Sequence, residues 1–203
     1  MPSVYELKSK FQNLLRPLVR MLHSIGITAN QVTIFAIFIS LATGLALYFI
    51  DSVLIYSIVP VALFIRMALN AIDGMLAREF KQASKTGAIL NELGDVFSDI
   101  FIYFPFAYIP GAEPSLVALF LFTAIIGEMT GVISVQIGAS RRYDGPMGKS
   151  DRAFVFSILS IVLAFGISPQ RWFDLTFLVL LVLSLYTILN RAVKALKEVK
   201  EGS

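Results

Sequence analysis

The residues best suited to do chemistry are acids and amides that interrupt two neighbouring apolar segments. Asn70 and Asp73 stand three positions apart, and Asn91, Asp95 and Asp99 follow at intervals of four. Either spacing places the side chains on one face of a helix. Ionisable groups inside apolar segments are costly and commonly functional, so this stretch is the candidate site.

The chemistry that these residue types favour is the binding of a hard divalent cation. Carboxylate and amide oxygens suit Mg²⁺, Mn²⁺ or Ca²⁺ better than zinc or copper. The alternative is that the carboxylates only form buried ion pairs with Arg66 or Arg78. We interpret four residues as the metal ligands: Asn70, Asp73, Asn91 and Asp95.

The composition is that of an integral membrane protein. The 203 residues are 57% hydrophobic and only 15% charged, well outside the usual range of soluble domains. No cysteine is present, so disulfides, thiolate catalysis and cysteine zinc sites are excluded. The one histidine, His23, falls in an amphipathic segment and is interpreted as an interfacial residue or a headgroup contact. We expect membrane lipids, and no nucleic acid, as partners.

The elements that must position the site are predicted to be helices. We expect one all-α domain over 1–203, with an amphipathic interfacial helix over 1–26, a six-helix transmembrane bundle over 27–192 and a tail over 193–203. Pro17 is expected to kink or divide the first helix. Each span takes about 20 apolar residues. The predicted spans are 29–50, 53–77, 87–108, 115–138, 152–168 and 173–192.

Lysine and arginine fall almost entirely on one side of these spans. Loops rich in these residues usually face the cytoplasm, so both termini and the 78–86 loop are predicted to be cytoplasmic, with Arg171 alone opposite. At about 1.5 Å of rise per residue, the four candidate ligands lie about 6 to 12 Å inside the cytoplasmic surface. The site is therefore predicted to open to the cytoplasm.

Three charged residues lie deeper, about 16 to 18 Å from the same surface. One charge alone at that depth would be expensive. We therefore expect a structural ion cluster in which Arg66 pairs with Asp99, Glu128 or both.

The stretch around these acids resembles the signature of the CDP-alcohol phosphotransferase family. The usual form of that signature is DxxDGxxAR, a gap, and GxxxDxxxD, and this chain has AIDGMLAR followed after eight residues by Gly87, Asn91 and Asp95. The six spans, the amphipathic first helix and the length are also similar to that family. Asn70, Asp73, Asn91 and Asp95 stand at the four acidic positions. The direct matches are Gly74, Ala77, Arg78 and Gly87.

The resemblance implies an activity and roles for these residues. A CDP-alcohol, commonly CDP-diacylglycerol, would pass its phosphoryl-alcohol part to an acceptor hydroxyl and release CMP, in phospholipid synthesis at a bacterial inner membrane. Mg²⁺ or Mn²⁺ would be the cofactor, and Asp95 the general base. The family also suggests a homodimer. The residues implied to contact CDP or its phosphates are Asp73, Gly74, Ala77, Arg78 and Gly87.

Two of the four usual acids are asparagines in this chain. An amide oxygen can still ligate a cation but brings no charge. We therefore expect weaker metal binding, with one permanent ion. A second ion would arrive with the CDP diphosphate, or Asp99 or Glu92 would compensate for the missing charge.

The basic segment from 138 to 154 is the candidate for the acceptor side. Lys149 and Arg152 are interpreted as acceptor-binding residues, for example for a phosphorylated alcohol. The ordinary excess of positive residues in cytoplasmic loops explains the segment equally well, and the acceptor itself does not follow from the sequence. Asn30, where the first span begins, either helps to close the nucleotide pocket or caps its helix.

The sequence leaves three functions open. The leading one is a CDP-alcohol phosphatidyltransferase. The missing acids motivate the second, a noncatalytic relative that binds CDP-lipid or nucleotide and acts through a partner. A small transporter that uses the buried charges as an ion path is the third, and the clustering of the acids on one side disfavours it.

Overall fold

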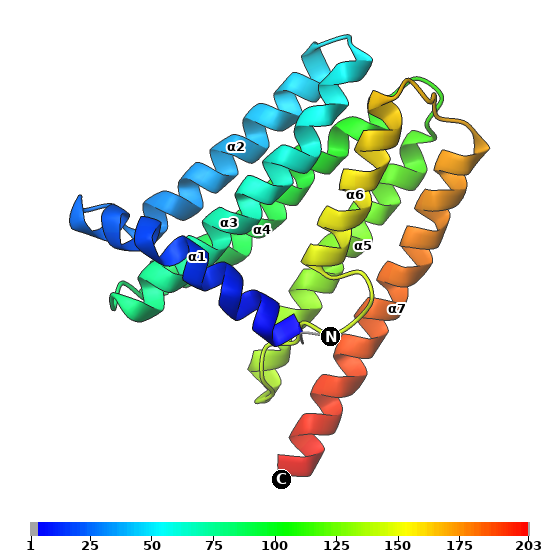
Figure 1. The fold of residues 1–203 in the computed structure, drawn as a ribbon. Helices are drawn as coiled ribbons and strands as arrows, with labels where there is room; N and C mark the ends of the chain where they lie inside the picture. Colours follow the sequence, from blue (N-terminus) through cyan, green and yellow to red (C-terminus); the bar gives the residue numbers. More distant parts are fainter. Residues whose placement is uncertain (1–3, 203) are drawn as a thin grey trace. The chain divides into compact units, whose positions relative to one another are not determined.

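The computed structural model describes residues 4–202, with side chains from residue 9 onward, and every regular element in that part is a helix. Residues 1–3 of the expected interfacial helix lie outside the described residues. The chain forms two compact units. Unit 1 comprises Met1–Thr43 and Val61–Asp99, and unit 2 comprises Gly44–Pro60 and Ile100–Ser203. Figure 1 follows the helices in chain order.

Four segments within residues 4–202 are long and apolar enough to cross a membrane, which makes the chain an integral membrane protein. Four of the six predicted spans meet this criterion. Of the other two, α6 (Lys149–Ala164) has only 16 residues, and α4 (Lys85–Tyr103) carries Glu92, Asp95 and Asp99. The four segments are Ala29–Phe49, Val53–Glu79, Pro114–Ile137 and Arg171–Gly202.

Unit 1 contains α1 and the parts of three long helices that run side by side in Figure 1. The first helix continues unbroken through Pro17, so the proline does not divide it. Gly26, with a φ of +82°, makes the turn that follows. Thr28 and Gln31 then form a reciprocal capping box at the beginning of α2. The backbone N–H of Thr28 donates to Gln31 Oε1 at 2.8 Å, and the backbone N–H of Gln31 donates to Thr28 Oγ1 at 3.3 Å. The helices are α1 (Val4–Ser24), α2 (Ala29–Phe49), α3 (Ile58–Glu79) and α4 (Lys85–Tyr103).

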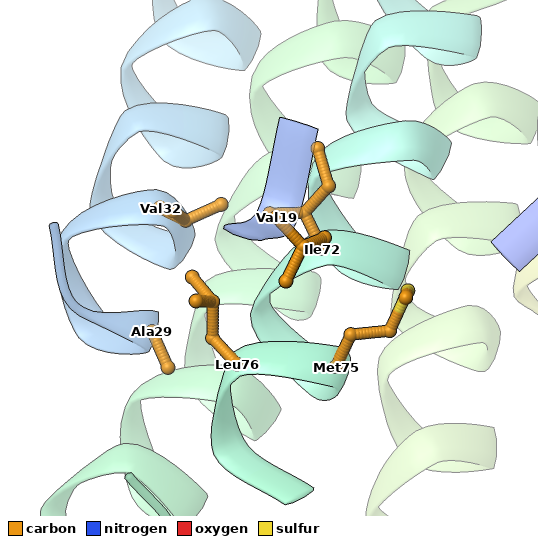
Figure 2. Packing of buried hydrophobic residues seen from close by; sticks show 6 residues of the cluster. All are labelled: Val19, Ala29, Val32, Ile72, Met75 and Leu76. Atoms are coloured by element: carbon orange, nitrogen blue, oxygen red, sulfur yellow. The ribbon is translucent and has the colours of Figure 1, made fainter. Parts of the chain in front are cut away.

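The helix α1 is fastened to α2 and α3 by an apolar cluster (Figure 2). Val19 is fully buried there, whereas Leu14 on the same helix is 75% exposed. Leu18 and Met21 of α1 are exposed as well, and so is Ile25 directly after the helix. A helix with an exposed apolar surface of this kind is suited to the membrane interface. The cluster consists of Val19, Ala29, Val32, Ile72, Met75 and Leu76.

Polar contacts reinforce this attachment near the end of α3. Arg16 forms an ion pair of 3.0 Å with Glu79. Gln82 accepts a hydrogen bond of 2.7 Å from the backbone N–H of Ala29, and its amide nitrogen lies 3.3 Å from His23 Nδ1. The ring of His23 also contacts the ring of Phe80 in a tilted arrangement, with 4.2 Å between the centroids. The single histidine therefore helps to hold α1 in place.

Unit 2 is built around a cluster of aromatic rings. Phe156 on α6 lies at its centre, with ring centroids 3.8 Å from Tyr103, 4.9 Å from Phe106 and 5.7 Å from Phe120. The segment expected as a tail after residue 192 is helical to Gly202, because α7 continues through it. The helices are η1 (Val53–Ser57), η2 (Phe104–Tyr108), α5 (Pro114–Ile133), η3 (Ser134–Ile137), α6 (Lys149–Ala164) and α7 (Arg171–Gly202).

Candidate functional site

The four candidate ligands lie on α3 and α4, within unit 1. Asn70 Nδ2 donates to Asp95 Oδ1 across 3.4 Å, which brings the two halves of the signature into contact. Asp73 is buried, and its Oδ2 accepts a hydrogen bond of 2.8 Å from Thr33 Oγ1 on α2. Asn91 lies half-buried one helical turn before Asp95. The sequence had given no sign of Thr33, which only the packing of α2 against α3 reveals.

The donor set fits a hard divalent cation only if the asparagines take part. No group of three or more His, Cys, Asp or Glu is placed to hold a metal among residues 4–202. Two carboxylates, from Asp73 and Asp95, and two amide oxygens, from Asn70 and Asn91, remain. Rotation of the Asn70 amide by half a turn would exchange its nitrogen for its oxygen, so that an amide oxygen faces Asp95 Oδ1.

Arg66 lies one turn before Asn70 on α3, with only 3% of its surface exposed. Its Nη1 donates to Asp99 Oδ1 at 2.5 Å. Its Nη2 donates to the backbone oxygen of Asp95 at 3.0 Å and lies 3.6 Å from Asp95 Oδ1. The guanidinium is therefore paired inside unit 1 and adjoins the candidate metal ligands.

Glu128 belongs to a cluster of three arginines in unit 2. Its carboxylate lies 3.0 Å from Arg152, 3.4 Å from Arg141 and 3.5 Å from Arg191. Arg152 and Arg191 are almost fully buried. Arg152 also donates a hydrogen bond to the backbone oxygen of Met147. Arg191 donates to the backbone oxygens of Gly127 and Asp144. The sequence did not predict these partners, because counting depth along single helices does not show how the loop after η3 folds back.

Of the two residues predicted for the acceptor side, Arg152 belongs to this cluster. Arg152 shares its guanidinium with Glu128 and the Met147 carbonyl. Lys149, at the first position of α6, is half-buried.

Two glycines of the signature make room for polar side chains. A Cβ at position 74 would lie 3.1 Å from both Nη atoms of Arg78, so the absence of a side chain lets this exposed guanidinium lie over α3. A Cβ at position 87 would lie 2.6 Å from Asn30 Oδ1. Asn30 thus reaches the beginning of α4, while Thr28 and Gln31 cap α2. Ala77 is half-buried on α3.

The loop between η3 and α6 is held to α7 by Asp144. Lys194 Nζ donates to Asp144 Oδ1 at 2.8 Å, and Arg142 lies 2.7 Å from Oδ2. The hydrogen bond from Lys194, aided by Arg142, lowers the pKa of Asp144 below its usual 3.8 although partial burial opposes the shift. Because the folded pKa is the lower one, this carboxylate stabilises the fold above the unfolded pKa and loses that contribution as the pH falls through the folded pKa.

We expect Asp144→Asn to reduce the acid sensitivity of the protein. Between about pH 5 and pH 2 the midpoint of thermal unfolding in detergent should fall more steeply for the wild type than for the variant, because only the wild type loses this carboxylate. Glu201→Gln, at an exposed position of α7, is the control and should follow the wild type. Parallel curves for the wild type and Asp144→Asn would contradict the assignment.

Fold and site together define an integral membrane protein with an oxygen-rich polar centre built from adjacent helices. Residues 26–195 match the family model of the CDP-alcohol phosphatidyltransferases, so the chain belongs to that family. The resemblance seen in the signature is thereby confirmed.

Two curated proteins illustrate the relationship. The inner membrane protein YnbA of Escherichia coli K12 is 44% identical over 189 residues, which cover 93% of this chain and 94% of that protein. Archaetidylinositol phosphate synthase of Pyrococcus horikoshii is 34% identical over 102 residues, about half of either chain (50% and 52%).

Solved structures show the same fold. Phosphatidylinositol phosphate synthase of Mycobacterium tuberculosis with CDP-DAG bound superposes with a TM-score of 0.72 at 21% identity, over 90% of this chain and 92% of that one. The same enzyme in complex with manganese and citrate gives a TM-score of 0.73 at 20% identity, over 88% and 87% of the two chains.

Proposed function

We propose that this chain is an enzyme that transfers a phosphatidyl group from a CDP-alcohol, most suitably CDP-diacylglycerol, to an acceptor hydroxyl and releases CMP in phospholipid synthesis. The observation that carries the proposal is the contact between Asn70 on α3 and Asp95 on α4, which joins the two halves of the family signature. The names of the archaeal and mycobacterial relatives, both synthases of inositol phosphate lipids, support the reaction class.

The residues of unit 1 have distinct tasks in this reaction. Asp73, Asp95, Asn70 and Asn91 would hold Mg²⁺ or Mn²⁺. When bound, the cation neutralises charge on the diphosphate and on the departing CMP. Arg78, with its guanidinium over Gly74, contacts phosphate oxygens as a charged fork.

Proton transfer is the task of Asp95. Its carboxylate takes the proton of the acceptor hydroxyl as that oxygen attacks the phosphorus that carries the lipid alcohol. A new O–P bond forms, the P–O bond to CMP breaks, and CMP leaves with the electron pair. Thr33 keeps the Asp73 carboxylate in place through its hydrogen bond. Gly87 and Ala77 line the nucleotide side.

The setting of the enzyme is part of the proposal. Six helices, α2 to α7, span a bacterial inner membrane, α1 lies on its surface, both termini are cytoplasmic and the site opens to the cytoplasm. The one-sided distribution of lysine and arginine supports this orientation. The relative YnbA is named as an inner membrane protein, which supports a location in that membrane. We propose a homodimer by analogy with the family, and Lys149 and Arg152 as contacts for an anionic acceptor.

A test of the function is CMP release by the purified chain. With CDP-diacylglycerol, Mn²⁺ and a panel of acceptors that includes glycerol 3-phosphate, inositol phosphate and serine, CMP should appear with at least one acceptor and a new lipid should be visible by mass spectrometry. The two asparagines favour a second candidate, a noncatalytic binder of CDP-lipid. Tight binding of CDP-diacylglycerol without CMP from any acceptor would support the binder and refute the enzyme.

Gly74→Ala should separate substrate binding from stability. Alanine is about 1 kcal/mol more favourable than glycine inside a helix, so the free energy of unfolding should hold or rise. The added methyl displaces the Arg78 guanidinium, and KM for CDP-diacylglycerol should rise about tenfold, as for the loss of one charged contact.

Gly127→Ala is the matched control for this variant. Position 127 also lies inside a helix, but a Cβ there meets only Ile188 Cγ1 at an ordinary 3.8 Å. It should show the gain in stability with an unchanged KM. An unchanged KM in Gly74→Ala would remove Arg78 from the substrate site.

A further inference from the structure

The negative charges of the candidate metal centre are partly compensated by an arginine of the protein itself. In unit 1 the guanidinium of Arg66 adjoins two carboxylates, at 2.5 Å from Asp99 Oδ1 and 3.6 Å from Asp95 Oδ1. Arg66 and Asp99 are buried, with 3% and 5% exposed, and the side chain of Asp95 is 21% exposed. Water therefore screens these charges little, and their balance is set by the neighbouring side chains.

Counting the formal charges on this face shows what the centre still lacks. Asp73, Asp95 and Asp99 bring three negative charges, and Arg66 brings one positive charge. The exposed Arg78 is not counted, because it is assigned to the substrate phosphates. Two negative charges remain, which one divalent cation neutralises. With aspartates in place of Asn70 and Asn91 four negative charges would remain, enough for two such cations.

The position of Arg66 also decides between the compensations considered from the sequence. Asp99 is engaged by Arg66 Nη1, so its charge is already matched. Glu92 follows Asn91 directly and therefore points about 100° away around the helix from the Asn91 side chain. Neither Asp99 nor Glu92 therefore replaces the negative charge that is missing because positions 70 and 91 carry asparagine.

We infer that Arg66 contributes a fixed positive charge to this centre, so that with asparagine at positions 70 and 91 the centre takes one Mg²⁺ or Mn²⁺ rather than two. The inference rests on the proposed function for the choice of metal, but it concerns the number of ions and not turnover. Arg66 is thus a positioning residue with a charge of its own in the centre, in addition to its ion pair with Asp99.

The number of ions can be measured on the purified full-length chain without nucleotide. Titration with Mn²⁺, followed by the electron paramagnetic resonance signal of the free ion, should give one bound equivalent for the wild type. Asn70→Asp combined with Asn91→Asp should give two. Two equivalents in the wild type, or one in the double variant, would overturn the inference.

Substitution of Arg66 tests its charge directly. Arg66→Met should tighten Mn²⁺ binding about tenfold at mildly alkaline pH, because a positive charge leaves a poorly screened site. A residue with a merely structural role would instead loosen binding when it is lost. Arg66→Lys keeps the charge and should bind like the wild type. Equal or weaker binding in a folded Arg66→Met variant contradicts the inference.

The experiment remains decisive if a variant or the proposed function fails. If Arg66→Met does not fold, the double aspartate variant, which leaves Arg66 in place, still settles the number of ions. If the wild type binds one Mn²⁺ but releases no CMP, the proposed function fails while the one-ion centre stands. If CMP is released and the wild type binds two Mn²⁺, the proposed function stands and the one-ion centre fails.

Discussion

Asp95→Asn is expected to reduce CMP release by about 10²- to 10⁴-fold, the range attributed to a general base. The amide cannot accept the proton of the acceptor hydroxyl, and it also removes one of the two charged ligands of the cation. The rate is measured with CDP-diacylglycerol and saturating Mn²⁺, so that weaker metal binding does not by itself account for the loss.

Two companion variants sharpen this result. Asp95→Glu keeps a carboxylate but moves it by about one bond length, and it should retain more activity than the amide. Glu201→Gln, which removes an exposed carboxylate from the end of α7, should leave the rate unchanged. An Asp95→Asn protein that keeps more than about a tenth of the wild-type rate would exclude Asp95 as the base.

Glu128→Leu is expected to cost about 3 to 5 kcal/mol of stability, as is usual when one partner of a buried ion cluster is lost. The variant leaves three arginines facing one another, and the side chains of Arg152 and Arg191 are 3% and 2% exposed. The measurement is the free energy of unfolding in mixed micelles with increasing denaturing detergent.

The control for Glu128 is an exposed pair in the same unit. Glu198 lies 2.6 Å from Arg142, but its side chain is 39% exposed. Glu198→Gln should therefore cost much less stability than Glu128→Leu, because water screens an exposed ion pair. Equal losses in the two variants would show that burial of the Glu128 cluster carries no special weight.

The sequence predicted the helices of this protein well because their apolar lengths are set by the bilayer. Four predicted spans correspond to helices within two residues at their beginnings. The polar face of α3 also followed directly from the spacing of Asn70 and Asp73. A fixed helical period, and not tertiary contact, determines both features.

Features that depend on contact between helices were less accessible. Thr33 lies 40 residues before Asp73, and no periodic pattern connects the two. The cluster around Glu128 forms because the loop carrying Arg141 folds back onto α5, with the backbone N–H of Arg142 donating to Gly131 O at 3.2 Å. Pairing of this kind is decided by packing in three dimensions, whereas depth along one helix constrains it only loosely.

The packing of α1 against α3 connects the candidate site to the surrounding lipid. Val19 packs in one cluster with Ile72 and Leu76, the first of which immediately precedes Asp73 on α3. We expect acyl chains to cover the exposed leucines of α1, Leu14 and Leu18. Headgroup composition and lateral pressure should then act on α1 and, through this cluster, on the helix that carries Asp73. Turnover measured in vesicles of graded anionic lipid content would reveal this coupling as a lipid-dependent kcat, which assays in micelles alone would miss.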